Sequence, residues 1–282
     1  MAMDSSVAKK EAKSKKTTPA RLLELSYHPD PSVQLVVSKH PNTPVAALEY
    51  LSSHGKVTIV KEIAKHPNTP SAILERLALH QQHTVVEIVA ENPKTPYATL
   101  ERLVTHPHHA VRAALTRHNA VTRVMLEKLS VDAHEHVRYW VAANDQCPIA
   151  LLTRLSADES EDVRCCVADS RQAPIALLEP LALDERAAVR GAVAGNDATP
   201  GKLLRKLACD PEAEVRRRTV YRLHVWEQHD LLELLVRDVS RDVREEVASY
   251  TQNPQFLVQL ASDPDARIRE RIARHNNTVN LD

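Results

Sequence analysis

The sequence predicts an all-α fold, a right-handed α-solenoid of about ten short two-helix repeats with a 26-residue period. The motif HPNTP at 40–44 returns at 66–70, and the related ENPKTP follows at 91–96. Leucine also recurs at two fixed positions of seven successive repeats, five and eight residues after the threonine position. The first of these two series is Leu48, Leu74, Leu100, Leu126, Leu152, Leu178 and Leu204. A period that holds through seven repeats indicates a stack of similar units.

The Thr-Pro step is expected to open the first helix of each repeat. Threonine is a preferred N-cap residue, and proline is favoured at the first helical position. The leucines that follow are spaced to form one apolar stripe on a helix. A turn and a V-R-x-x-V-A segment, such as 163–168, complete the repeat and predict a second helix of about two turns. Helices this short are unstable alone, so burial against neighbouring repeats must stabilise them.

The repeats predict a simple domain organisation, with a disordered basic tail at 1–17 and a single solenoid domain at 18–282. Five lysines fall within 9–16, which favours either a solubility extension or a handle for an acidic partner. A repeat shifted by one residue begins at Thr18, and two less regular repeats cover 224–279.

Composition excludes several classes of protein. The 282 residues hold 37 Lys and Arg against 37 Asp and Glu, and only four Gly. Four scattered glycines cannot form a phosphate-binding loop, and zero net charge argues against binding nucleic acid over the whole surface. No apolar run approaches the roughly 20 residues of a membrane span, and the first residues lack the apolar core of a secretory signal. We therefore expect a cytoplasmic protein without cofactor or metal, and with reduced thiols because its four cysteines lack close C-x-x-C pairing.

Two sequence patterns resemble known repeat families. The unit N-P-x-T-P-x-x-x-L-x-x-L, which 92–103 matches in full, is similar to the leucine-rich repeat variant family, whose members pair an α-helix with a short, often 3₁₀, second helix. The D-x-x-x-x-V-R step at 132–138 resembles HEAT repeats, although those are usually roughly 40 residues long. The resemblance covers nearly the whole chain after residue 17 and implies the fold. It does not imply one function, because such folds carry binding, enzymatic and scaffold roles alike.

Acidic and basic residues recur in register in the later repeats. Eleven residues after the threonine position, the chain has His in the first three of the seven repeats and Asp in the other four. Six residues after that His or Asp, the third and all later repeats have Arg. This pattern predicts an Asp–Arg ladder in which each carboxylate accepts hydrogen bonds from a guanidinium of its own or the next repeat, and the resemblance to HEAT repeats implies the same. A structural role, rather than a DNA-binding stripe, is therefore expected for Asp132, Arg138, Asp158, Arg164, Asp184, Arg190, Asp210 and Arg216.

Twelve of the fifteen histidines lie in the N-terminal half of the chain. His54, His80 and His106 occupy equivalent positions in repeats that should be on the order of 10 Å apart, too far to share one metal ion at bonds of about 2 Å. We interpret them as caps of the turns. Two alternatives stay open: a local site at His106, His108 and His109, and a pH-sensing role, because imidazoles charge near pH 6.5.

The second helices are expected to line the concave wall of the solenoid, as in similar repeat folds. Their outward positions vary most along the chain while the leucines stay fixed, which is typical of a surface that contacts a partner. Small side chains predict a trough in the middle repeats, at Ala113, Ala143, Cys165, Gly191 and Gly195. Tyr, Trp and Arg, which anchor many interfaces, flank the trough. The predicted partner-binding residues are Tyr139, Trp140, Arg117, Arg217, Arg218 and Tyr221. The alternative is that Trp140 belongs to the core and that the glycines permit tight helix packing.

These features favour a non-enzymatic scaffold that binds a protein or peptide partner through its concave face. Catalysis is not indicated, because only one His-Glu step is present, His134-Glu135, and adjacent Cys165 and Cys166 are typical of packed core. The alternative is a nucleic-acid-binding or DNA-repair protein, since DNA glycosylases with HEAT-like folds use a basic concave face, a carboxylate and aromatic residues. That alternative would use Arg117, Arg217, Arg218, Arg222, Asp169 and Trp226.

Overall fold

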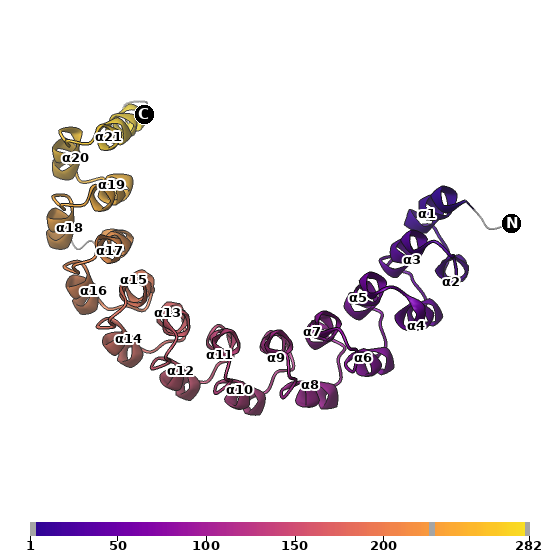
Figure 1. Ribbon diagram of the computed structural model, residues 1–282. Helices are drawn as coiled ribbons and strands as arrows, with labels where there is room; N and C mark the ends of the chain where they lie inside the picture. The colour runs from indigo at the N-terminus through magenta and orange to yellow at the C-terminus, as the bar shows by residue number, and fades with distance from the viewer. Residues whose placement is uncertain (1–3, 226–228, 280–282) are drawn as a thin grey trace. The chain divides into compact units, whose positions relative to one another are not determined.

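The computed structural model describes residues 4–225 and 229–279, with side chains at 4–223 and 230–274. Within these residues the chain forms twenty-one helices joined by short turns, and no strand. Figure 1 shows the helices following one another as a tandem array. One helix precedes the array, and the remaining twenty form ten pairs. The prediction of an α-solenoid of about ten two-helix repeats is therefore confirmed.

The first helix of each pair has an even number and the second an odd number. The even-numbered helices are α2 (Pro19–Ser26), α4 (Val45–His54), α6 (Ser71–Leu77), α8 (Tyr97–Leu103), α10 (Arg123–Leu129), α12 (Ile149–Leu155), α14 (Ile175–Leu181), α16 (Gly201–Leu207), α18 (His229–Leu235) and α20 (Pro254–Ala261). The odd-numbered helices are α1 (Ser5–Lys13), α3 (Pro31–Ser38), α5 (Val57–Lys65), α7 (His83–Glu91), α9 (His109–Leu115), α11 (Glu135–Ala142), α13 (Glu161–Asp169), α15 (Ala187–Gly195), α17 (Ala213–Val225), α19 (Arg241–Tyr250) and α21 (Ala266–Val279). Among these described helices, none is both long enough and apolar enough to cross a membrane.

The chain divides into two compact units, Met1–Gln146 and Cys147–Asp282, which we call the N-terminal and C-terminal units. The sequence predicts one domain over 18–282, whereas the structure groups the repeats in two. The physical reason lies in the architecture, because each repeat of a solenoid packs only on its neighbours and no single core spans the whole array.

Each unit has two layers of helices. The odd-numbered helices pack on one another in order, α1 to α11 in the N-terminal unit and α13 to α21 in the C-terminal unit, and each even-numbered helix packs on the odd-numbered helix of its pair. The core lies between the layers, where Leu74 and Leu77 of α6 are buried with Val85, Val86 and Val89 of α7. Burial of this apolar surface stabilises helices that would not persist alone.

The threonine of the Thr-Pro step mostly closes the preceding helix, so the N-cap prediction is wrong for these repeats. Thr43 Oγ1 donates to Val37 O at 2.6 Å and to His40 O at 2.7 Å. Helix α4 accordingly begins at Val45, with Pro44 at the N-cap position. The expected capping is found at Thr18, whose side chain accepts from the backbone of α2. A carbonyl at the C-terminal end of a helix lacks a partner within that helix, and the buried hydroxyl supplies one.

Residues 4–17 are ordered, which corrects the prediction of a disordered tail at 1–17. Asp4 caps α1 by accepting from Ser6 N at 2.7 Å, and Ala8 and Ala12 are fully buried where α1 packs on α3. Glu11 is ion-paired with Arg21 at 2.8 Å. The lysines of this segment suggest a solvated tail, but two alanines four residues apart form an apolar helix face.

Candidate partner-binding surface

Guanidinium groups tie later repeats to the repeats that follow them. Arg164 of α13 donates from Nε to Asp184 Oδ2 at 2.7 Å and from Nη1 to Asp158 O at 2.8 Å. Arg164 thus bonds the turn of its own repeat and the carboxylate of the next one. Asp184 therefore accepts from the preceding repeat, which corrects the prediction of a guanidinium from its own or the next repeat, because the arginine side chain reaches forward along the stack. The other forward pairs, with Nε to Oδ2 distances of 2.5 to 2.7 Å, are Arg112–Asp132, Arg190–Asp210, Arg216–Asp238 and Arg244–Asp263. Arg138 donates from Nη1 to Asp132 O at 2.8 Å.

The ladder pairs are largely buried and ionised. The Arg164 side chain is 12% exposed and that of Asp184 is 9% exposed. Burial alone would raise the pKa of Asp184, but hydrogen bonds from Arg164 and from the Arg186 backbone outweigh it and hold the pKa below 3.8. For Asp263 the hydrogen bonds from Arg244 are the largest influence, and its pKa is also lowered. These arginines are therefore engaged within the fold.

A second set of polar residues joins the repeats and was missed in the sequence. It occupies the position three residues before the threonine, at the end of the odd-numbered helix. Asn92 Nδ2 donates to Ala64 O at 2.6 Å, and its Oδ1 accepts from Lys94 N at 2.9 Å. His118 does the same with its ring, because Nε2 lies 2.9 Å from Asn92 O and Nδ1 accepts from Ala120 N at 3.0 Å. We call these residues the junction residues: His40, His66, Asn92, His118, Asn144 and Asn196. Their signal in the sequence is the His or Asn that opens HPNTP and NPKTP.

Histidines also occur in the turns between paired helices. His80 Nδ1 accepts from Gln82 N at 3.0 Å and His106 Nδ1 accepts from His108 N at 3.1 Å, as expected for turn caps. His54 Nδ1 instead lies 3.0 Å from Tyr50 O. In the part of the chain that the structure describes, no group of three or more His, Cys, Asp or Glu residues is arranged to hold a metal ion.

A pocket of about 260 Å³ lies between the C-terminal ends of α9 and α11, and two of the predicted partner-binding residues line it. The Arg117 guanidinium carbon is 4.7 Å from the centroid of the Trp140 ring, a cation–π contact. Arg117 is also ion-paired with Glu91 of α7. Trp140 Nε1 donates to His136 Nε2 at 3.0 Å, and Tyr139 packs edge-on against the indole with ring centroids 5.5 Å apart. Trp140 is half-buried and lines the pocket, so its ring is not enclosed in the core.

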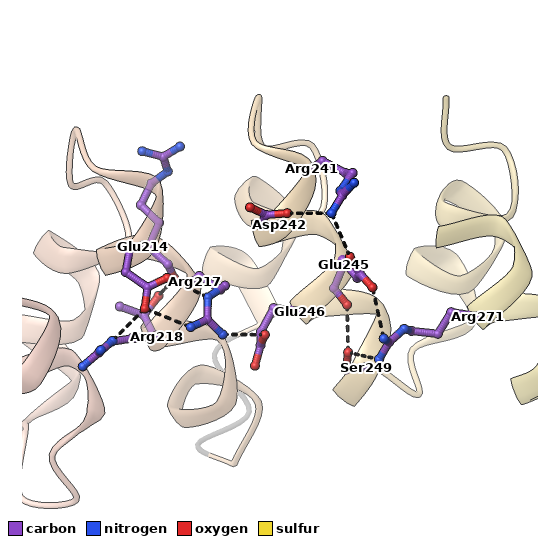
Figure 2. Close-up of polar contacts among 11 residues, drawn as sticks. Glu214, Arg217, Arg218, Arg241, Asp242, Glu245, Glu246, Ser249 and Arg271 are labelled. Carbon is purple, nitrogen blue, oxygen red and sulfur yellow. Dashed lines mark hydrogen bonds and ion pairs between the residues drawn. The ribbon is translucent and has the colours of Figure 1, made fainter. Parts of the chain in front are cut away.

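The other three predicted partner-binding residues belong to the C-terminal unit, where carboxylates neutralise both arginines. Arg217 donates to Glu214 at 2.8 and 2.9 Å and to Glu246 of α19 at 2.9 Å, and Arg218 donates to Glu214 at 2.9 Å (Figure 2). Hydrogen bonds from Arg217 lower the pKa of Glu214 to about 2. Tyr221 is 49% exposed and packs on Tyr250 with ring centroids 5.2 Å apart. The structure therefore gathers the six predicted residues as two groups, one in each unit.

The small residues of the predicted trough have different surroundings. A Cβ at Gly191 would lie 3.2 Å from Arg218 Cδ, whereas a Cβ at Gly195 would meet no atom within 4 Å. Burial raises the pKa of the Cys165 thiol to about 11 and that of Cys166 to about 12, so both are protonated and poorly nucleophilic at neutral pH. Trp226, proposed for the nucleic-acid alternative, lies outside the described residues.

Comparisons with known proteins agree with the architecture. No family model matches the chain, and no curated protein matches it. Among solved structures it is similar to a leucine-rich repeat variant with a novel repetitive motif, with 27% sequence identity and a TM-score of 0.56 over 72% of this chain and 80% of that one. It also matches an engineered protein, at 12% identity and a TM-score of 0.32 over 98% and 94% of the two chains. A computationally designed armadillo repeat protein for modular peptide recognition matches at 16% identity and a TM-score of 0.21 over 90% and 96%. The last two are too distant to support an argument, whereas the first confirms the resemblance found in the repeats.

Proposed function

We propose that this chain, a repeat α-solenoid of the leucine-rich repeat variant type, is a non-enzymatic scaffold that binds a protein or peptide along the exposed side of its odd-numbered helices. The observation that carries the proposal is the pocket between α9 and α11, with Arg117 seated on Trp140. Concave pockets with an aromatic wall and a few polar groups are the usual form of a binding site.

The pocket offers contacts of the kind that protein partners use. Trp140 is held by Arg117 on its face and by His136 at its Nε1, so a partner side chain that packs on it meets an ordered indole and loses less entropy. Asn119 and Gln146 also line the pocket and can hydrogen-bond to a peptide backbone. Aromatic and arginine anchors of this kind carry a large share of the affinity at protein interfaces.

The charges favour a protein over a nucleic acid. Nucleic-acid affinity comes mainly from cations that neutralise phosphates. Here Arg117 is paired with Glu91, and Arg217 with Glu214 and Glu246. Arg222, another arginine of the nucleic-acid alternative, donates to Asp197 at 2.7 Å. Each of these cations would have to leave a carboxylate before it could bind a phosphate.

The proposal is tested by affinity capture from a lysate of the source cell, with nuclease present, followed by direct titration of the captured partner with the purified chain. The baits are wild type and Trp140→Ala. Interface hot spots of this type contribute about 2 kcal/mol or more, so we expect affinity to fall by a factor of about 30 in Trp140→Ala.

The matched control is Tyr97→Ala, which removes an aromatic side chain that is 48% exposed on α8, in the other layer of the same unit. We expect the control to bind like wild type. Melting curves of both variants separate loss of binding from loss of folding. Equal binding by Trp140→Ala and Tyr97→Ala would contradict a site in this pocket, and material that is captured only without nuclease would favour the nucleic-acid alternative.

A further inference from the structure

A row of imidazole rings runs across the N-terminal ends of α7, α9 and α11. His83 stacks on His108 with ring centroids 3.5 Å apart and planes 8° from parallel, and His109 stacks on His134 at 3.7 Å and 16°. His108 and His109 link the two stacks, with centroids 4.9 Å apart. In each stack, one ring belongs to the first residue of an odd-numbered helix, and the other belongs to the residue just before the next odd-numbered helix. We call His83, His108, His109, His134 and His136 the imidazole row.

Hydrogen bonds at three rings require unprotonated nitrogens. His108 Nδ1 accepts from Ala110 N at 3.2 Å, and His134 Nδ1 accepts from His136 N at 3.2 Å. His136 Nε2 accepts the Trp140 indole N–H at 3.0 Å. A ring nitrogen that accepts a hydrogen bond carries no proton, so these bonds are lost when the ring becomes an imidazolium.

The surroundings of His109, the middle ring of the row, disfavour positive charge. Burial lowers the pKa of His109, and the neighbouring His134, His108, Arg112 and His136 lower it further. Its Nδ1 is buried and has no hydrogen-bond partner among the described residues. Burial likewise lowers the pKa of His106, which adjoins the row.

The groups that face the row come from three helices and the turns before them. Helix α7 contributes His83, α9 contributes Arg112, and α11 contributes His136, with exposed Glu135 beside it in the chain. The carboxylate of Asp132 faces His134. Asp132 already accepts two hydrogen bonds from Arg112, at 2.5 and 2.7 Å, so it cannot compensate several new charges.

Two junctions of the C-terminal unit fill the same position with opposite charges. Glu161, the first residue of α13, pairs with Arg186 before α15 at 3.3 Å, and Arg241, the first residue of α19, pairs with Asp265 before α21 at 3.8 Å. This position therefore brings two side chains of consecutive repeats together. Oppositely charged pairs remain attractive between pH 5 and 8, whereas two histidines become like charges when both take a proton.

We propose that the imidazole row is a pH-sensitive joint of the N-terminal unit. Neutral rings hold α7, α9 and α11 together and fix Trp140, and acidification splits the stacks and releases the indole from His136. The direction follows from linkage. Because the pKa of His109 is lower in the folded chain, the unfolded chain takes up a proton at this residue first, and the stability that neutral His109 contributes above pH 6.5 is lost as the pH falls below it.

The test follows the full-length chain between pH 7.5 and 5.5 with two measurements. Hydrogen exchange, corrected for intrinsic rates, should become about tenfold faster in α9 while α13 and α15 stay unchanged. In a Trp226→Phe background, where Trp140 is the single tryptophan, its fluorescence should change between pH 7.5 and 5.5 as the bond to His136 is lost. Equal changes of exchange in both units, or a flat fluorescence profile, would overturn the proposal.

Three variants of the row make the test specific. Replacing the stacks by the pair found in the C-terminal unit, with His83→Glu, His108→Arg, His109→Glu and His134→Arg, should abolish the pH dependence of exchange in α9. His136→Gln keeps an acceptor for Trp140 that does not titrate, and should abolish the fluorescence transition alone. If the fourfold variant does not fold, His109→Ala, which copies Ala187 at the equivalent position of α15, should reduce the pH dependence. Variants that titrate like wild type would refute the joint.

Discussion

Consecutive repeats of the N-terminal unit are joined largely by imidazole and amide side chains, whereas those of the C-terminal unit are joined by guanidinium–carboxylate pairs. Five of the six junction residues belong to the N-terminal unit, and four of the five forward Arg–Asp pairs belong to the C-terminal unit. Both devices satisfy backbone carbonyls at the ends of short helices. The comparison teaches that one architecture can rest on chemically different polar side chains at its junctions.

The largest expected effect is that of strong acid on the C-terminal unit. The pKa values of Asp184, Asp210 and Asp263 are lowered in the folded chain, so the stability they contribute is present above pH 3.8 and lost as the pH falls through the folded values. Helical protection of α13 to α19 should stay constant from pH 8 to 5 and fall once the pH drops below 3.8. Hydrogen exchange and circular dichroism measure this, and a loss already at pH 5.5 would show that the ladder does not dominate this unit.

Removing one guanidinium of the ladder tests how much a buried Arg–Asp pair stabilises the C-terminal unit. Arg164→Ala leaves Asp184 buried without its guanidinium partner, and removal of one member of a buried pair costs about 3 kcal/mol. The free energy of unfolding from denaturant titration should fall by that amount. Arg186→Ala is the matched control, because its ion pair with Glu161 is exposed and such pairs contribute about 0 to 1 kcal/mol. Similar losses in the two variants would contradict a structural role for the ladder.

The equivalent break in the N-terminal unit is Asn92→Ala. It leaves the Ala64 carbonyl and the Lys94 amide without their partner, which should cost about 2 kcal/mol of unfolding free energy. Asn92→His should retain most of the stability at pH 8, since His66 and His118 serve at the equivalent position, and should lose it on acidification. A histidine variant as unstable as the alanine variant would show that amide and imidazole are not interchangeable there.

The smallest expected effects concern the two glycines of α15. Gly195→Ala adds a methyl group that meets no atom within 4 Å and should raise the unfolding free energy by about 0.5 kcal/mol through reduced backbone entropy. Gly191→Ala gains the same entropy but presses on Arg218, so it should be closer to neutral. Thermal melts show which of the two variants is more stable. The opposite order would mean that Arg218 moves aside without cost.

The repeat, the helix pairing and the ladder positions could be predicted because a fixed period places equivalent residues in equivalent surroundings. The forward direction of the ladder was also readable in principle. Arg112 appears one repeat before the first aspartate of the series, Asp132, as expected if each arginine reaches into the next repeat. The junction residues had a comparable signal in the His and Asn that open HPNTP and NPKTP.

Other features could not be derived from the pattern. Thr-Pro is typical of a helix start, but the buried hydroxyl of Thr43 is used by the preceding helix, which depends on packing. Helix α1 escaped prediction because its lysines dominate the composition while only Ala8 and Ala12 face the core. Stacking of His109 on His134 depends on side-chain rotamers in adjacent repeats, and the ion pair of Arg217 with Glu246 joins residues 29 apart in the chain.

The ladder arginines bond aspartates of the next repeat, and this affects whether the array can lose or gain whole repeats. Arg164 and Arg190 bond aspartates 20 residues ahead, Arg216 reaches 22 residues, and Arg244 reaches 19. Loss of 26 residues between two equivalent positions leaves an arginine facing an equivalent aspartate. The Arg–Asp pair therefore forms again where the two remaining parts of the chain meet. Deletion or duplication of whole 26-residue repeats would therefore yield shorter or longer arrays that keep the Arg–Asp pairs. Selection can adjust the length of the exposed helical surface by whole repeats, without a new core.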